Sequence, residues 1–253
     1  QRIEAQTIAQ SGWDYTDSSS YITLSFWIRA SVAQNYIVNM YANDGTNRHF
    51  PFEVPLNANI WTKVTKSIPG YSGITITNDI ENGATIAFIA AYGTNYTSTS
   101  GYFDTWNTTG GGTNRWPDMA TKWSTTTNAT FDITGVQLEV GSQATPFEFR
   151  SYGEELALCQ RYYIKDTMIR EGSGYGVVTT ALDSIVGIQV DFPVTMRDTP
   201  DVDLLGTTYR TGGSANASRF SSSGFIWGRK QTGSGTFSGA AYATGGYTAK
   251  AEL

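Results

Sequence analysis

The sequence predicts an all-β protein, and two features of composition and one of pattern point to this class. Only 15% of the 253 residues are charged, below the roughly 25% usual in soluble domains, and 27 glycines stand among many Thr, Ser and Asn residues. Residues that stiffen at χ1 or compete with the helix backbone for hydrogen bonds disfavour long helices. The third feature is a series of short apolar stretches with a period of two, which is typical of strands that bury one face.

The first strand is expected at residues 21–29, where Ile22, Leu24, Phe26 and Ile28 alternate with other residues. Trp27 stands on the face opposite Phe26, and we expect it to pack within the sandwich. Further strands are expected at 36–41, 50–54, 61–68, 74–77, 85–91 and 131–140, with turns at 43–46, 69–70 and 81–83. This series of short strands predicts a β-sandwich domain over residues 1–150.

Residues 151–163 are expected to form a short connecting helix. Ser151 and Glu154 have the spacing of a capping box, and Leu156, Cys159 and Tyr163 recur at helical spacing. Cys159 is expected to be a small buried apolar residue on that helix.

A smaller β-sandwich domain is expected at residues 164–253. Its predicted strands lie at 176–182, 185–192, 202–205, 225–227 and 247–253, and the Gly/Ser-rich stretches 211–218 and 231–239 are expected to be exposed turns.

The charge and the scarcity of Cys and His exclude several classes of function. The formal net charge is −5, so the sequence predicts no nucleic-acid partner. No apolar run is long enough to span a bilayer, so no membrane insertion is expected. With one cysteine and one histidine, no intrachain disulfide and no zinc site of Cys and His ligands can form. His49 has no nucleophile motif beside it and is expected to be an ordinary strand or loop residue. We therefore expect a protein that is not an enzyme.

The junction at residues 133–163 resembles a segment that recurs in tail-fibre and other virion structural proteins of tailed bacteriophages. It reads ITGVQLEVGSQATPFEFRSYGEELALCQRYY, and three further stretches match that group: LSFWIR at 24–29, FPVTMRDTP at 192–200 and AEL at 251–253. The first part is similar to carbohydrate-binding jelly rolls attached to polysaccharide-degrading enzymes, through its LSFW strand and its FDITGV strand.

The resemblance implies an N-terminal jelly roll in an extracellular virion appendage, a tail or capsid fibre, that attaches to the host surface. It implies a homotrimer whose partners are other virion proteins and a host cell-surface glycan. The alternatives are a purely structural or decoration protein and a polysaccharide depolymerase. For a depolymerase the nominal carboxylate pairs would be Asp14 with Asp17, Asp79 with Glu81, or Asp104 with Asp118.

Residues 92–128 lack periodicity and are rich in aromatic side chains, which indicates a functional loop. Trp and Tyr can stack on the apolar C–H face of a pyranose, while amide and charged groups bond its hydroxyls. The predicted glycan-binding residues are Trp106, Trp116, Trp123, Tyr102, Asp104, Asn107, Asn114, Arg115 and Asp118. The alternative is that these rings fasten the loop to its own sandwich or to a neighbouring subunit.

Two further sites are considered. No cofactor is expected, except that Glu4 and Asp132 could contribute to a structural Ca²⁺ site of the kind that the resemblance implies. In the second domain Trp227, Tyr209, Tyr242 and Tyr247 lie in sequence beside Arg210, Arg229 and Lys230, and they are either host contacts or residues of a core or an interface.

Overall fold

The computed structural model shows an all-β protein, which confirms the fold class. It describes residues 1–45, 47–98, 102–108, 116–166, 172–178, 184–205, 208–210, 214–231, 235–243 and 246–251. The chain forms two compact units, Gln1–Phe149 and Arg150–Glu252. None of the helices in the described ranges has the length and apolar character needed to cross a membrane.

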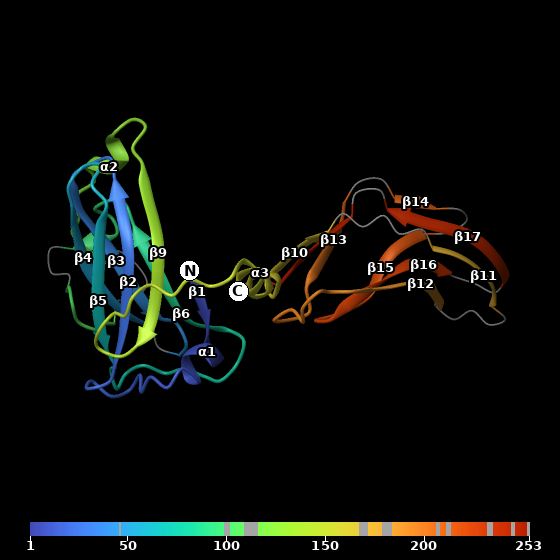
Figure 1. Cartoon of the computed structure of the whole chain (residues 1–253), viewed down its shortest axis with the longest axis horizontal. Helices are drawn as coiled ribbons and strands as arrows, with labels where there is room; N and C mark the ends of the chain where they lie inside the picture. The colour runs from blue at the N-terminus through green and yellow to red at the C-terminus, as the bar shows by residue number, and fades with distance from the viewer. Residues whose placement is uncertain are drawn as a thin grey trace. The chain divides into compact units, whose positions relative to one another are not determined.

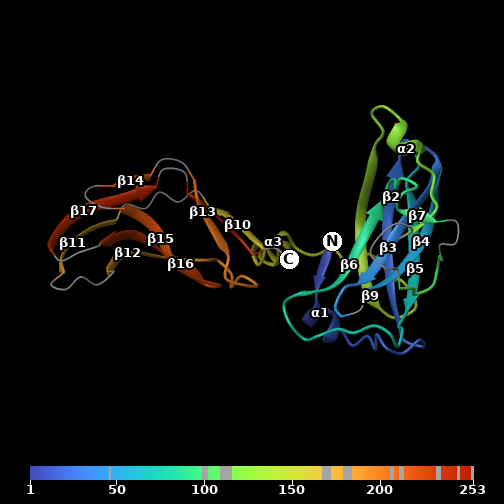
Figure 2. The ribbon, with the colours of Figure 1, turned by 180° about the vertical axis from the view of Figure 1, so that it is seen from behind.

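The first unit contains two antiparallel sheets packed face to face, which Figures 1 and 2 show from opposite sides. The four-stranded sheet has the order β1-β6-β3-β4, and the three-stranded sheet has the order β5-β2-β9. Their strands are β1 (Arg2–Glu4), β2 (Tyr21–Ala30), β3 (Gln34–Ala42), β4 (Arg48–Leu56), β5 (Thr62–Pro69), β6 (Asn82–Ile89) and β9 (Phe131–Val140). The finer jelly-roll assignment remains a prediction.

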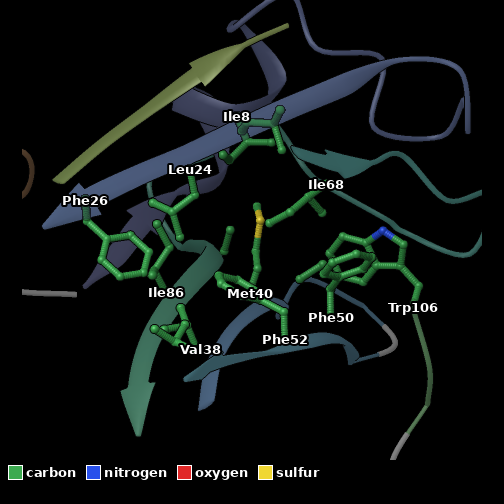
Figure 3. Packing of buried hydrophobic residues seen from close by; sticks show 14 of the residues in the cluster. Ile8, Leu24, Phe26, Val38, Met40, Phe50, Phe52, Ile68, Ile86 and Trp106 are labelled. Atoms are coloured by element: carbon green, nitrogen blue, oxygen red, sulfur yellow. The ribbon is translucent and has the colours of Figure 1, made fainter. Parts of the chain in front are cut away.

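The core lies between the two sheets because alternate residues of each strand point inward. Leu24 and Phe26 of β2 meet Val38 and Met40 of β3 there, as Figure 3 shows. The core is closed by the short helix α1 (Ala5–Ala9), which buries Ile8.

The strand predicted at 74–77 is wrong, because this stretch belongs to no strand or sheet. Its apolar residues, Ile74 and Ile76, are nevertheless buried in the core. The alternation of apolar residues at 74–77 therefore indicates burial. It does not indicate a strand, because no neighbouring strand pairs with this stretch.

The segment expected to be one long loop contains three short elements: β7 (Thr97–Ser98), β8 (Trp116–Pro117) and α2 (Lys122–Thr125). Strands β7 and β8 pair in parallel. Part of this segment covers the side of the four-stranded sheet that points away from the core between the sheets, where Phe103 and Met119 pack against Ile37 and Ile89.

The second unit begins with α3 (Tyr152–Gln160), whose capping box is confirmed. The Ser151 hydroxyl accepts a hydrogen bond from the Glu154 amide, and the Glu154 carboxylate accepts one from the Ser151 amide. The pKa of Glu154 is lowered, chiefly by that bond from the Ser151 amide. The prediction that Cys159 is buried is wrong, because none of the residues of α3 is buried and the thiol is exposed.

Three antiparallel sheets of three strands each follow, with the orders β10-β18-β13, β11-β17-β14 and β12-β16-β15. The strands are β10 (Tyr163–Asp166), β11 (Gly172–Val178), β12 (Ser184–Asp191), β13 (Asp201–Leu204), β14 (Thr208–Arg210), β15 (Ser214–Ser221), β16 (Gly224–Gln231), β17 (Gly235–Ala243) and β18 (Tyr247–Lys250). Residues 179–182 and 252–253 of the expected strands lie outside the described residues.

In the two Gly/Ser-rich stretches expected to be exposed turns, residues 214–218, 231 and 235–239 lie in strands, so the prediction is wrong for them. Residues 211–213 and 232–234 lie outside the described residues. β15 pairs with β16, and β17 pairs with both β11 and β14. Small residues such as Gly239 and Ala240 can join a ladder because pairing uses the backbone alone.

Among the residues that the structure describes, the core of the second unit contains Tyr247 beside Phe192 and Phe225. Tyr247 is therefore a core residue, one of the two alternatives considered for it. The side chains of Tyr209, Arg210, Trp227, Arg229, Lys230 and Tyr242 lie outside the described part of the chain.

Candidate functional site

The expectation that Trp106 is a glycan platform is wrong, because its side chain belongs to the core. Only 8% of Trp106 is exposed, and its ring packs against Phe50 of β4 with the centroids 5.5 Å apart (Figure 3). The indole N–H donates to the carbonyl oxygen of Pro69 at 2.6 Å. A long segment that crosses a sandwich needs an apolar anchor, and Trp106 supplies it.

Trp123 is half-buried and fastens its own segment. Its indole N–H donates to the carbonyl of Thr130 at 3.1 Å, and its backbone amide donates to the Gln34 side chain at 2.9 Å. The ring lies edge-on to Phe131. These contacts match the alternative in which the rings hold the loop to the sandwich.

The other predicted glycan-binding residues do not form one described cluster. Tyr102 and Asp118 are exposed. Asp104 forms an ion pair with Lys66, with 2.6 Å between Oδ1 and Nζ, and Asn107 bridges His49 through backbone bonds. The backbone of Trp116 lies in β8, but its side chain is not among the described parts of the chain. Asn114 and Arg115 lie entirely outside the described residues.

The two residues considered for Ca²⁺ lie in different sheets. Glu4 of β1 is buried and accepts a hydrogen bond from the Gln6 side chain, whereas Asp132 of β9 pairs with Arg29. Within the described ranges, no cluster of three or more Asp, Glu, His or Cys side chains could hold a metal ion. The residues that the structure describes therefore give the calcium prediction no support.

The carboxylates considered for catalysis serve local turns where the structure describes their bonds. Asp14 accepts from Thr16, Asp17 accepts from Ser19, and Asp79 accepts from Thr77 and the Glu81 amide. The bond from the Ser19 amide lowers the pKa of Asp17 most. His49 lies buried in β4 with its ring against Tyr41, which confirms a strand position.

An exposed aromatic face lies instead on the outer surface of the three-stranded sheet. Trp27 points away from Phe26, as expected, but the prediction that it packs within the sandwich is wrong because 42% of it is exposed. Trp61, just before β5, is 40% exposed and Phe147 is 41% exposed. We call the surface formed by Trp27, Arg29, Trp61, Lys63, Asp132, Thr134 and Phe147 the outer face.

A β-bulge holds Trp27 on this surface. The pairing of β2 with β9 shifts register between Ser25 and Trp27, and opposite the shift Gly135 has φ +59°, a left-handed conformation that glycine adopts without cost. A Cβ atom on Gly135 would lie 3.4 Å from the Trp27 ring and 3.9 Å from the Phe147 ring. The rings of Trp27 and Phe147 therefore lie beside the backbone of Gly135, which has no side chain.

Charged side chains border the indole of Trp27. Lys63 and Thr134 stand directly opposite Trp27 on the two neighbouring strands, and both are exposed. Two residues along β2, Arg29 contacts Asp132, with Oδ2 3.1 Å from Nε and 3.0 Å from Nη2. The guanidinium carbon of Arg29 also lies 5.0 Å from the ring centroid of Trp61, a cation–π contact.

The segment after β9 folds back along the same sheet and is fastened by two side chains of β9. The Glu139 carboxylate accepts hydrogen bonds from the Thr145 amide and from the Gln137 side chain. The Gln137 carbonyl oxygen accepts one from the Glu148 amide. The bonds from Gln137, which has the largest effect, and from Thr145 lower the pKa of Glu139. Together with the Glu148 bond they hold the residues on either side of Phe147.

The outer face combines the groups that carbohydrate recognition requires. Aromatic rings offer an apolar surface for stacking, and hydroxyl, ammonium and guanidinium groups can bond sugar hydroxyls at its edge. Sequence reasoning missed this face, although a signal was present. Trp27 shares the polar side of its strand with Thr23 and Arg29, so the alternation that buries Phe26 turns Trp27 outward.

Comparisons with models of protein families, with curated proteins and with solved structures found no match for this chain.

Proposed function

We propose that the unit Gln1–Phe149 binds carbohydrate on its outer face. The observation that carries this proposal is the exposed indole of Trp27, fixed by the Gly135 bulge next to Phe147. Exposed apolar surface rimmed by polar residues is typical of interaction sites, and the rings of Trp27 and Phe147 both lie beside Gly135. A sugar ring stacked on the exposed indole would leave its other side in water.

The proposed setting is a virion appendage of a tailed bacteriophage that attaches the particle to a host cell-surface glycan. This setting rests on the resemblance of residues 133–163 to phage virion proteins. The proposed assembly is a homotrimer, in which several weak sugar sites per particle would add up to firm attachment. No bond is broken in this proposal, because its mechanism is reversible adsorption.

The test is a glycan array and a host-cell binding assay with the purified full chain. We expect Trp27→Ala and Trp61→Ala to lose binding while the circular dichroism spectrum and the sedimentation coefficient stay unchanged. Tyr102→Ala and Tyr96→Ala, which remove exposed rings elsewhere in the unit, are matched controls. Binding by the Trp27→Ala protein equal to that of the parent would contradict the proposal.

A purely structural virion protein is the second candidate. It is supported by the burial of Trp106 and the packing of Trp123, which show aromatic residues of this chain serving its own architecture. If the outer face belongs to a subunit interface, Trp27→Ala will lower the oligomeric state measured by sedimentation. An intact oligomer that no longer binds cells supports adhesion instead.

A further inference from the structure

We infer that the outer face selects an acidic saccharide, one bearing a carboxylate or a sulfate, and this inference rests on the proposed carbohydrate binding. It follows from the charges next to Trp27. We call a row the set of residues that stand opposite one another on neighbouring strands. The rows of Trp27 and Arg29 contain two cations, Lys63 and Arg29, and one anion, Asp132. The balance of +1 contrasts with the net charge of −5 for the whole chain.

Lys63 is the cation most available to a ligand. It is exposed and stands in register with Trp27 on the adjacent strand, so about 5 Å separates the two backbones. Its ammonium group has no ion-pair partner among the residues that the structure describes. A long flexible side chain at that distance can reach the edge of a sugar ring lying on the indole.

Arg29 keeps part of its hydrogen-bonding capacity. Both Nε and Nη2 of Arg29 contact a single oxygen of Asp132, Oδ2. Within the described ranges, Nη1 of Arg29 has no hydrogen-bond acceptor. The side chain of Arg29 remains 40% exposed while its position is fixed by Asp132 on one side and by the Trp61 ring. A guanidinium held in this way can donate to a carboxylate or sulfate without losing further side-chain freedom.

The nearest anions on the same side of the sheet belong to other rows than those of Trp27 and Arg29. Glu139 lies opposite Thr23, four residues along β2 from Trp27, and its oxygens accept bonds from Gln137 and Thr145. Glu148 is placed by its amide beside Gln137, which is opposite Ser25. Lys63 and Arg29 therefore lie nearer to Trp27 along the sheet than Glu139 does.

The test compares an oligosaccharide of uronic acids with its carboxyl-reduced, neutral counterpart of the same linkage, by calorimetry with the full chain. We expect the acidic form to bind several-fold more tightly at low salt, with a preference that declines as salt rises. Each exposed charge pair is worth about 2- to 5-fold in affinity. Lys63→Gln should lower the affinity for the acidic form by that factor more than the affinity for the neutral form, because its amide can still bond a sugar hydroxyl, whereas Lys122→Gln, an exposed lysine of α2, should change neither affinity.

The outcomes separate this inference from the proposed function. Equal binding of both oligosaccharides, lost in Trp27→Ala, would overturn the inference and leave carbohydrate binding standing. A preference for the acidic form that persists in Lys63→Gln and in Arg29→Gln would also overturn it. Absence of any glycan ligand for the parent chain on an array of acidic and neutral sugars would overturn the proposed function itself.

Discussion

Arg29 and Asp132 face each other across the β2–β9 ladder, with the guanidinium group held between the carboxylate and the ring of Trp61. Asp132 thus fixes the direction of Arg29 and at the same time offsets its charge. Both side chains are about 40% exposed, so the pair contributes little to stability, on the order of 0.2–1 kcal/mol. Its main effect is on the geometry and the potential of the outer face.

Replacing Asp132 with Asn should therefore change binding more than stability. The variant removes one negative charge from the outer face and leaves an oxygen that can still accept from Arg29. We expect a several-fold gain in affinity for an acidic oligosaccharide and a loss of less than about 1 kcal/mol in the free energy of unfolding. Calorimetry and urea denaturation measure the two quantities, and a fall in affinity for the acidic sugar would contradict the assignment of charges.

Gly135→Ala tests the bulge that supports Trp27. An alanine at φ +59° costs about 1–2 kcal/mol, and its methyl group would come into contact with the rings of Trp27 and Phe147. We expect a loss of stability of this size together with weaker glycan binding. Gly153→Ala is the control, because a Cβ there meets no atom within 4 Å and α3 lies in the other unit. Unchanged stability for Gly135→Ala would show that the bulge does not need glycine.

Acid should release the segment that carries Phe147. The pKa of Glu139 is lower in the folded protein than its ordinary value, so the bonds to Glu139 stabilise the fold fully above about pH 4.3 and progressively less as the pH falls through the lowered pKa. We expect the NMR signals of Thr145 and Phe147 to shift in that acidic range. Glu139→Gln should abolish this pH dependence, and a Phe147 signal that follows the same titration without Glu139 would contradict it.

Trp106→Ala should destabilise the first unit by about 3–5 kcal/mol, because it removes a buried ring and leaves the Pro69 carbonyl without its donor. Trp27→Ala, at an exposed position, should change stability by about 0.5 kcal/mol or less. Thermal unfolding followed by tryptophan fluorescence distinguishes the two variants. Similar losses of stability for both would mean that Trp27 also has a packing role.

Asn39 offers a test in which a substitution should raise the free energy of unfolding. It is fully buried on β3, on the side of the sheet covered by Phe103 and Met119, and neither atom of its amide has a hydrogen-bond partner among the residues that the structure describes. Burying an unsatisfied amide costs about 1–3 kcal/mol. Asn39→Leu should therefore raise the free energy of unfolding by up to that amount, while Asn35→Leu at an exposed position of the same strand should not. Destabilisation by Asn39→Leu would show that the amide is satisfied in solution.

The sequence predicts the strands of the first unit best where apolar residues alternate over a long stretch. β9 has the predicted bounds, and β2 extends one residue beyond them. β15 and β17 were missed because Gly-, Ala- and Ser-rich strands carry no alternation, even though their backbones pair as well as any other. The pattern therefore identifies strands that bury side chains, and it misses strands held mainly by their ladders.

The candidate site was less predictable than the fold for a related reason. Alternation tells which face of a strand a residue occupies, but only the folded chain shows what covers that face. Trp106 has no period around it that predicts burial, and it anchors a loop to Phe50. Trp27 lies at the exposed end of the outer side of β2, whose other end is buried at Thr23 and Ser25.

The exposed thiol on α3 has a practical consequence. Cys159 is the single cysteine of the sequence, and it lies in the second unit, whereas the outer face belongs to the first. A maleimide reagent can therefore attach the unaltered chain to a sensor surface or a dye at one known position. Every copy would then be tethered by the same residue, and the affinities of Trp27, Lys63 and Asp132 variants could be compared without random coupling through the lysine that is under test.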